Sequence, residues 1–185
     1  MIGTWTQPAA TCASRENSWS SPWVGIDGNA SNTVEQIGTD TDCQNGTPFY
    51  YAWYEMYPKS LVTIAMAVHP GESFTGEVTN VSSGTFVLRL RDNTTGASFQ
   101  TTQTSKKAKA SSVEWVMEGP SSGLLTNFGS VPFGAASATI SGQTGNLGSF
   151  AAAQPITMVT RAGAPRAVPS AVSGGTSFGV SWLHN

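Results

Sequence analysis

Charged side chains are scarce in this sequence, because Lys, Arg, Asp and Glu make up only 11% of its 185 residues, against roughly 25% in typical soluble proteins. Nine Lys and Arg are too few for the basic surface of a nucleic-acid-binding protein. The 11 Asp and Glu are likewise too few for a strongly acidic surface. Acid denaturation comes largely from protonating carboxylates that are paired in the native state. The composition is therefore compatible with work at acid pH, and we expect no nucleic-acid partner.

Cysteine and histidine are nearly absent as well, with two residues of each kind. No CxxC pair and no Cys/His cluster surrounds Cys12 or Cys43, which argues against a zinc site. We accordingly predict neither a metal nor a cofactor. In an extracytoplasmic protein Cys12 and Cys43 would pair, and two separate buried thiols are the alternative.

The sequence also lacks long hydrophobic runs. The longest apolar stretch, about 61–68, is far shorter than the roughly 20 residues that a membrane-spanning helix needs. No charged-then-apolar leader precedes it. Residues 1–5 have the pattern of a strand that is already under way, as in a mature or truncated chain. We expect a secreted, monomeric protein with no membrane partner.

Short alternating segments, separated by turn residues every 8 to 12 positions, dominate what is present. This spacing predicts one all-β domain, a sandwich or barrel, over residues 1–185. Asn45-Gly46 predicts a hairpin turn, whereas 141–154 and 162–176 are expected to be long surface connections. The predicted strands are Gly3–Gln7, Ser21–Asp27, Val34–Thr39, Phe49–Tyr57, Thr63–Val68, Ser73–Val81, Phe86–Arg91, Ser98–Thr104, Val113–Glu118, Asn127–Phe133, Ile156–Thr160 and Phe178–Trp182.

The strand predicted at 49–57 is unusual because both of its faces are aromatic. A period of two places Trp53, Glu55 and Tyr57 on one face, with Tyr54 and Met56 on the other. One aromatic face can belong to a core, and a second one that carries a glutamate indicates a groove for an extended ligand. The alternative is a strand enclosed between its sheet and a covering loop.

Two polar residues stand on other predicted strands. Gln36 and Glu35 point to opposite faces of the strand at 34–39, so one of them must face the interior or a cleft. Glu114 shares its face with Glu118, while the alternate residues of that strand are apolar. By pattern alone, Gln36 is a hydrogen-bonded polar group and Glu114 a surface acid.

Several spaced motifs, in this order, resemble the glutamic peptidases, or eqolisins, which are acid endopeptidases with a Gln/Glu dyad. The motifs are Gly-Thr-Trp-Thr-Gln-Pro at 3–8, Trp-Val-Gly-Ile-Asp-Gly at 23–28, the strands of Gln36 and Glu114, Tyr-Ala-Trp-Tyr-Glu-Met-Tyr-Pro at 51–58, and Ser-Phe-Gly-Val-Ser-Trp at 177–182. The resemblance implies an antiparallel two-sheet β-sandwich of the concanavalin A-like lectin/glucanase type, with a substrate groove on one concave face. Relatives carry a further first strand with an Asn-Trp-small-Gly sequence, which is missing here.

The resemblance also implies roles for individual residues. Gln36 and Glu114 match the dyad, with polypeptides as substrates. The matches to cleft positions are Trp23, Asp27, Trp53, Glu55 and Tyr57. In the implied chemistry Glu114 activates a water that attacks the peptide carbonyl directly, and the Gln36 amide holds that water and donates to the oxyanion.

Other functions stay open on the residues alone. The sequence Gly-Thr-Ser-Phe-Gly at 175–179 matches a serine-hydrolase pattern, but no acid follows it, and we treat it as chance. Glu55 and Glu114 could form the two-carboxylate pair of a glycoside hydrolase across strands. A lectin-like binding module on the same sandwich, without turnover, is the other alternative.

Overall fold

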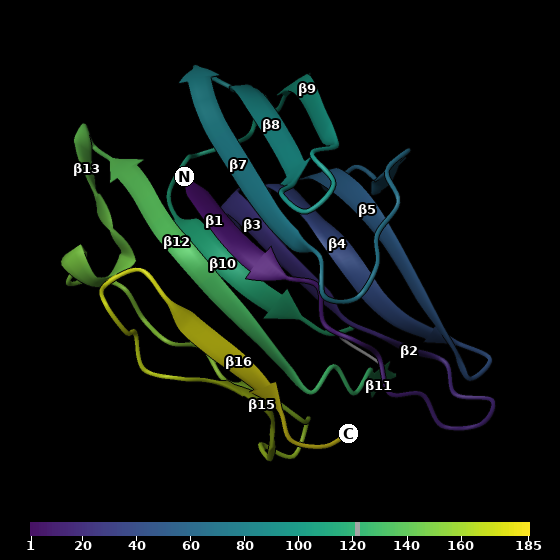
Figure 1. The fold of residues 1–185 in the computed structure, drawn as a ribbon. Coiled ribbons are helices and arrows are strands. Elements are labelled where there is room, and N and C mark those ends of the chain that lie inside the picture. Colours follow the sequence, from purple (N-terminus) through teal and green to yellow (C-terminus); the bar gives the residue numbers. More distant parts are fainter. Residues whose placement is uncertain (121–122) are drawn as a thin grey trace.

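The computed structural model describes residues 1–120 and 123–185, which form two β-sheets packed face to face (Figure 1). The first sheet has the strand order β14-β15-β16-β12-β1-β7-β8-β9, with β13 paired to β12. Its strands are β1 (Ile2–Thr6), β7 (Ser73–Ser82), β8 (Thr85–Asp92), β9 (Ser98–Thr104), β12 (Ser130–Ile140), β13 (Gln143–Asn146), β14 (Met158–Val159), β15 (Pro165–Pro169) and β16 (Phe178–Trp182).

The second sheet contains the order β10-β3-β4-β5-β6, with β2 and β11 continuing from the far end of β4. Its strands are β2 (Ser18–Trp19), β3 (Ser21–Asp27), β4 (Val34–Gln44), β5 (Thr47–Tyr57), β6 (Val62–Ile64), β10 (Val113–Glu118) and β11 (Leu124–Leu125). Every strand pair is antiparallel except β2–β11. Among the described residues, the 3₁₀ turn η1 (Leu147–Ser149) is the one helical element. The predicted two-sheet β-sandwich is confirmed.

The core lies between the sheets because alternate residues of each strand point inward. Phe86, Leu88 and Leu90 of β8 are buried, as their alternation predicts. They belong to one core cluster with Val24 and Ile37 of the second sheet. Burial of this apolar surface is the main stabilising contribution to the fold.

Turn chemistry at Asn45-Gly46 was predicted correctly. Both residues have positive φ, 50° and 80°, which matches the twist of a two-residue hairpin between β4 and β5. Strand bounds were less accurate. The polar sequence after Thr39 concealed the continuation of β4 to Gln44, and β15 lies inside a predicted connection because its flanking prolines indicated a loop.

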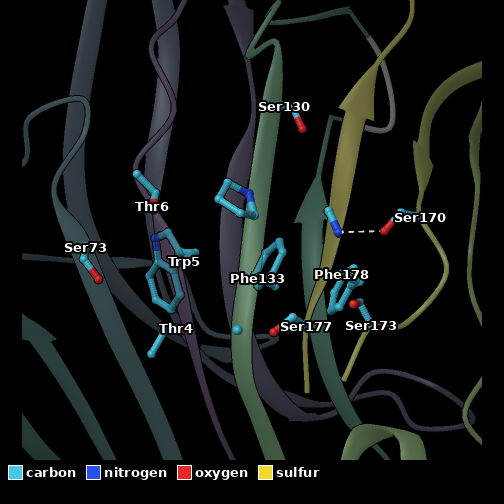
Figure 2. Close-up of a pocket in the computed structure, with 13 residues that line it drawn as sticks. Thr4, Trp5, Thr6, Ser73, Ser130, Phe133, Ser170, Ser173, Ser177 and Phe178 are labelled. Atoms are coloured by element: carbon cyan, nitrogen blue, oxygen red, sulfur yellow. Dashed lines mark hydrogen bonds between the residues drawn. The ribbon is translucent and has the colours of Figure 1, made fainter. Parts of the chain in front are cut away.

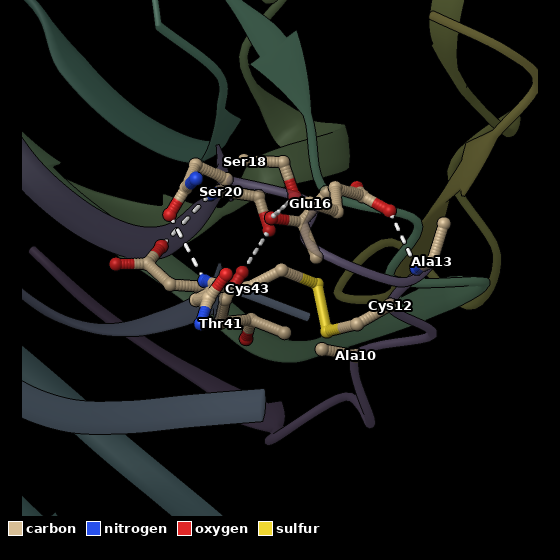
Figure 3. Close-up of a disulfide and its surroundings, with 12 residues drawn as sticks. Ala10, Cys12, Ala13, Glu16, Ser18, Ser20, Thr41 and Cys43 are labelled. Atoms are coloured by element: carbon tan, nitrogen blue, oxygen red, sulfur yellow. Dashed lines mark hydrogen bonds between the residues drawn. A yellow bond between two sulfur atoms is a disulfide. The ribbon is translucent and has the colours of Figure 1, made fainter. Parts of the chain in front are cut away.

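Cys12 and Cys43 form a disulfide, as one of the two alternatives predicted, with 5.7 Å between their Cα atoms (Figure 3). The bond ties the segment after β1 to the end of β4. Next to it, the Ser20 hydroxyl donates to the carbonyl oxygen of Thr41 over 2.8 Å. The β2 end of the second sheet is therefore held covalently as well as by hydrogen bonds.

One acid lies on the core side of β4. Glu35 has no exposed surface, and neither of its carboxyl oxygens has a hydrogen-bond partner of acceptable geometry. Burial raises the pKa of Glu35 to about 7, the hydroxyl of Ser105 opposes that rise, and the negative charge of Asp27 adds to it. The carboxyl is therefore held in its protonated form at acid pH.

Glu35 should make the fold less stable toward neutrality. The unfolded chain releases this proton near the ordinary pKa of 4.5, whereas the folded chain keeps it to about 7. The contribution of Glu35 to the free energy of unfolding is therefore full below pH 4.5. It falls by roughly 3 kcal/mol as the pH rises from 4.5 to about 7. Glu35→Gln should remove this contribution, while Asp42, whose pKa burial also raises to about 7, keeps its own. Urea unfolding followed by fluorescence at about pH 4 and about pH 7.5 measures it.

The matched control is Glu77→Gln, which changes a carboxylate of the first sheet that pairs with Arg89 over 3.0 Å. This variant should keep the parent's difference in unfolding free energy between the two pH values. An unchanged difference in Glu35→Gln would show that Glu35 does not set the pH dependence.

Candidate active site

Gln36 and Glu114 are brought into one row by strand register. Gly25 on β3 pairs with Gln36 of β4 on one side and with Glu114 of β10 on the other. Two strand spacings separate the dyad residues, roughly 10 Å between Cα atoms. Gly25 has no side chain to fill the interval, and an added Cβ would lie 3.1 Å from the Cβ of Gln36. The row places an amide and a carboxyl group on either side of a residue without a side chain, and the ring of Trp23 comes within 3.0 Å of the place a Cβ would take.

The amide of Gln36 is held by Glu55, the next residue in the same row on β5. Its Nε2 donates to Oε2 of Glu55 over 2.6 Å. Its Oε1 is buried and has no partner. Gln36 is thus on the sheet face turned away from the core, whereas Glu35 is inside, which resolves the alternative that the sequence left open.

Glu114 is half-buried at the junction of β10 with the loop after β3. Its Oε1 accepts from the backbone N–H of Asn29 over 2.7 Å and from the hydroxyl of Ser112 over 3.0 Å. Gly28 has φ of 103°, and a Cβ there would be 2.7 Å from Oε2 of Glu114, so a residue without a side chain is required. Burial raises the pKa of Glu114, and the two donors oppose that rise.

Asp27 lies behind Glu114 and is fully buried. Its carboxylate accepts from the backbone N–H groups of Lys109, Ala110 and Ser111 at 2.8 to 3.1 Å. Burial opposes ionisation of Asp27, but these donors and the Ser111 hydroxyl hold its pKa below the usual range. Asp27 fixes the segment that leads into β10, and thereby the position of Glu114.

Two indole rings occupy the row next to the dyad. Trp23 and Trp53 both pair with Gly38 of β4. Nε1 of Trp23 donates to Oε2 of Glu118 over 2.8 Å, and Nε1 of Trp53 donates to Oδ1 of Asp40 over 2.7 Å. We call the surface formed by nine residues the dyad face. They are Trp23, Gly25, Gln36, Gly38, Asp40, Trp53, Glu55, Glu114 and Glu118.

Sequence reasoning did not select Asp40 or Glu118 as site residues. The available signal was their spacing, since each lies four positions after a dyad residue and so shares its strand face. Burial raises the pKa of both, and Glu118 also lies in the field of Glu55, Asp40 and Glu114. The carboxyl groups of the dyad face therefore release their protons at a higher pH than isolated carboxyls do.

The predicted cleft residues separate into two groups. Trp23, Trp53 and Glu55 lie on the dyad face beside the dyad. Tyr57 ends β5 opposite Val34 and is 50% exposed, one register step beyond that row. Asp27 contacts backbone groups and exposes no surface.

A hollow of about 480 Å³ opens on the first sheet, over β1, β12 and β16 (Figure 2). It contains Ser177 of the Gly-Thr-Ser-Phe-Gly sequence, with Ser170 and Ser173 nearby. Its lining residues include no histidine, carboxylate, lysine or arginine. It therefore has no general base for Ser177, which agrees with the interpretation of that motif as chance.

Within residues 1–120 and 123–185, no three His, Cys, Asp or Glu side chains are grouped as a metal site would require. In the same residues, no helix has the length and apolar character needed to cross a membrane.

Comparison with known proteins identifies relatives of this arrangement. A model of the peptidase A4 family matches residues 1–182. Aspergillopepsin-2 of Aspergillus niger is 35% identical over 135 residues, which cover 67% of this chain and 47% of that protein. The chain therefore spans about half the length of the curated relative that it matches.

Solved structures give the same result for the fold. Aspergilloglutamic peptidase from Aspergillus niger superposes with a TM-score of 0.79 at 27% identity, over 89% of this chain and 99% of that one. Scytalido-glutamic peptidase with a peptide-based transition-state analogue superposes with a TM-score of 0.77 at 23% identity, over 98% and 91% of the two chains. These similarities confirm the β-sandwich and the resemblance on which it was predicted.

Proposed function

Because this chain belongs to the peptidase A4 family, we propose that it is an acid endopeptidase that hydrolyses peptide bonds of polypeptide substrates. The observation that carries the proposal is the row Gln36–Gly25–Glu114. It presents an amide and a carboxyl group on either side of Gly25, which has no side chain. No covalent intermediate is required, because a water held between the two groups can attack the carbonyl carbon directly.

Glu114 is the general base and then the general acid. Ionised Glu114 takes a proton from the attacking water and gives it to the departing amine. Its Oε1 keeps two donors, the Asn29 N–H and the Ser112 hydroxyl, which stabilise the ionised form. Its raised pKa keeps the proton available for the second step at acid pH.

Gln36 is the neutral partner. Its amide holds the water and donates to the oxygen of the carbonyl as negative charge develops there. An amide does not titrate, so this role survives at a pH that would protonate a carboxylate. Trp23 and Trp53 border the same position and supply apolar surface for an extended chain.

Glu55 and Glu114 do not suit a glycoside hydrolase as well. Three strand spacings separate them, roughly 14 Å between Cα atoms. Each carboxyl also has its own hydrogen-bond partners, Gln36 for one and Asn29 with Ser112 for the other. The side chain that faces Glu114 across Gly25 is an amide.

We also propose secretion and a monomeric state. The Cys12–Cys43 disulfide supports secretion, because such bonds persist in oxidising compartments. The low content of charged residues and the acid-tolerant composition support work in an acidic medium.

The test is digestion of an acid-denatured protein from about pH 2 to about pH 7, since the general acid–base groups are carboxyls. Peptide fragments should appear at the acid end. Metal chelators, serine-directed reagents and inhibitors of the aspartic-protease type should leave the rate largely intact. Sugar release without proteolysis would favour the glycoside hydrolase, and binding without turnover the lectin-like module. Inhibition by a chelator would reveal a metal site.

A further inference from the structure

The Gln36 amide is only half satisfied in this structure. Nε2 donates to Glu55, but Oε1 is buried without a donor. A buried acceptor with no partner costs about 1–3 kcal/mol. An amide carries its oxygen and nitrogen on diverging bonds, so one of them faces Glu55 and the other does not. Oε1 can gain a donor from Glu55 only if the carboxyl there is protonated.

Resting on the function proposed above, we propose that Glu55 is a positioning residue that sets the orientation of the Gln36 amide through its own protonation. An ionised carboxylate can only accept, and it takes the Nε2 hydrogen bond that the structure shows. A protonated carboxyl keeps an oxygen that accepts and gains an O–H that can donate to Oε1. It binds Oε1 once the amide has turned over, and Nε2 then occupies the position where Oε1 had no partner.

The turn changes what the amide can do for catalysis. When Oε1 is the atom directed away from Glu55, that side of the Gln36 amide can only accept a hydrogen bond. With Nε2 there, it donates, which is what a developing oxyanion requires. Protonated Glu55 is therefore the form that supports the reaction, while Glu114 must be ionised to act as base. Activity is confined to a pH range in which one carboxyl is protonated and the other is not.

The surroundings of Glu55 support this assignment. Burial raises its pKa, and the hydrogen bond from Gln36 opposes the rise. Glu118 on β10 lies in the field of Glu55, and the other charges that act on Glu118 are also acids, Asp40 on β4 and Glu114 on β10. Trp23 and Gly25 are the nearest dyad-face residues of β3, and β6 adds Val62, Thr63 and Ile64, so neither strand brings a cation.

The experiment compares pH profiles of kcat and KM for Glu55→Gln and the parent. A glutamine at 55 can donate to Oε1 at every pH, so it imitates the protonated carboxyl. The parent should lose activity as the pH rises and Glu55 ionises. Glu55→Gln should stay active and keep its kcat further toward neutrality. Glu55→Ala, which offers no donor, should lose up to about 10²-fold in kcat with little change in KM.

Glu118→Gln is the matched control. It removes another dyad-face carboxyl, which contacts Trp23 and not Gln36. It should retain the loss of activity toward neutrality. If Glu55→Gln showed the parent profile, or were folded but inactive while Glu55→Asp was active, the proposal would be overturned.

A second measurement needs neither activity nor a variant at 55. The side-chain N–H signals of Gln36, assigned by their absence in Gln36→Ala, are followed by ¹⁵N NMR through the acid range. Their shifts should report the titration of a neighbouring carboxyl. Signals that do not move overturn the proposal. If they move while the parent cleaves no protein, the positioning role stands and the peptidase assignment fails.

Discussion

Glu114→Gln should lose at least about 10²-fold in kcat/KM for cleavage of denatured protein, the usual size of general acid–base effects. The variant should fold normally, because its amide oxygen can still accept from Asn29 and Ser112. What it lacks is a group that can take a proton from water and return it to the leaving amine. Initial rates of fragment release at the parent's best pH, with circular dichroism as a check of folding, measure the effect.

Glu118→Gln serves as the control for Glu114→Gln. The two acids share a face of β10, four residues apart, but Glu118 lies beside Ser21 rather than Gly25. Glu118→Gln should lower kcat/KM far less than Glu114→Gln does. Near-parental proteolysis by Glu114→Gln would contradict the assignment of Glu114 as the proton-transfer group.

Gln36→Ala should lower kcat by about 10²–10³-fold, the range found when one oxyanion donor is removed. KM should change little, because the charge that the amide stabilises exists only in the transition state. Steady-state kinetics with a fluorogenic peptide separates the two constants. If only the unfolding midpoint fell and kcat were kept, Gln36 would be a structural polar group.

Gln36→Glu sharpens the same test. It replaces a neutral donor by a carboxyl between Glu55 and Glu114 in the row. When ionised, this group repels the oxyanion and raises the pKa of its acidic neighbours. The variant should be poorly active near neutrality, with residual activity confined to strongly acid pH. Parental rates across the pH range would exclude the oxyanion role.

Turn and strand predictions succeeded where local chemistry decides the outcome. Asn45-Gly46 adopts the positive φ values of its turn because these residue types tolerate them. Phe86, Leu88 and Leu90 are buried because alternation on a strand selects one face. β15 was missed since its pairing with β16 outweighs the local signal of Pro165 and Pro169.

The sequence by itself determined the all-β class and the alternating faces of Gln36 and Glu114, because these depend on spacing along one strand, and its motifs carried the family resemblance that implied the two-sheet sandwich. Only the tertiary structure decided that Gly25 separates Gln36 from Glu114, that Glu55 holds the Gln36 amide, and that Asp27 fixes the loop behind Glu114. Each of these contacts depends on the register between strands distant in sequence. Register is set by how the whole core packs, and no single segment encodes it.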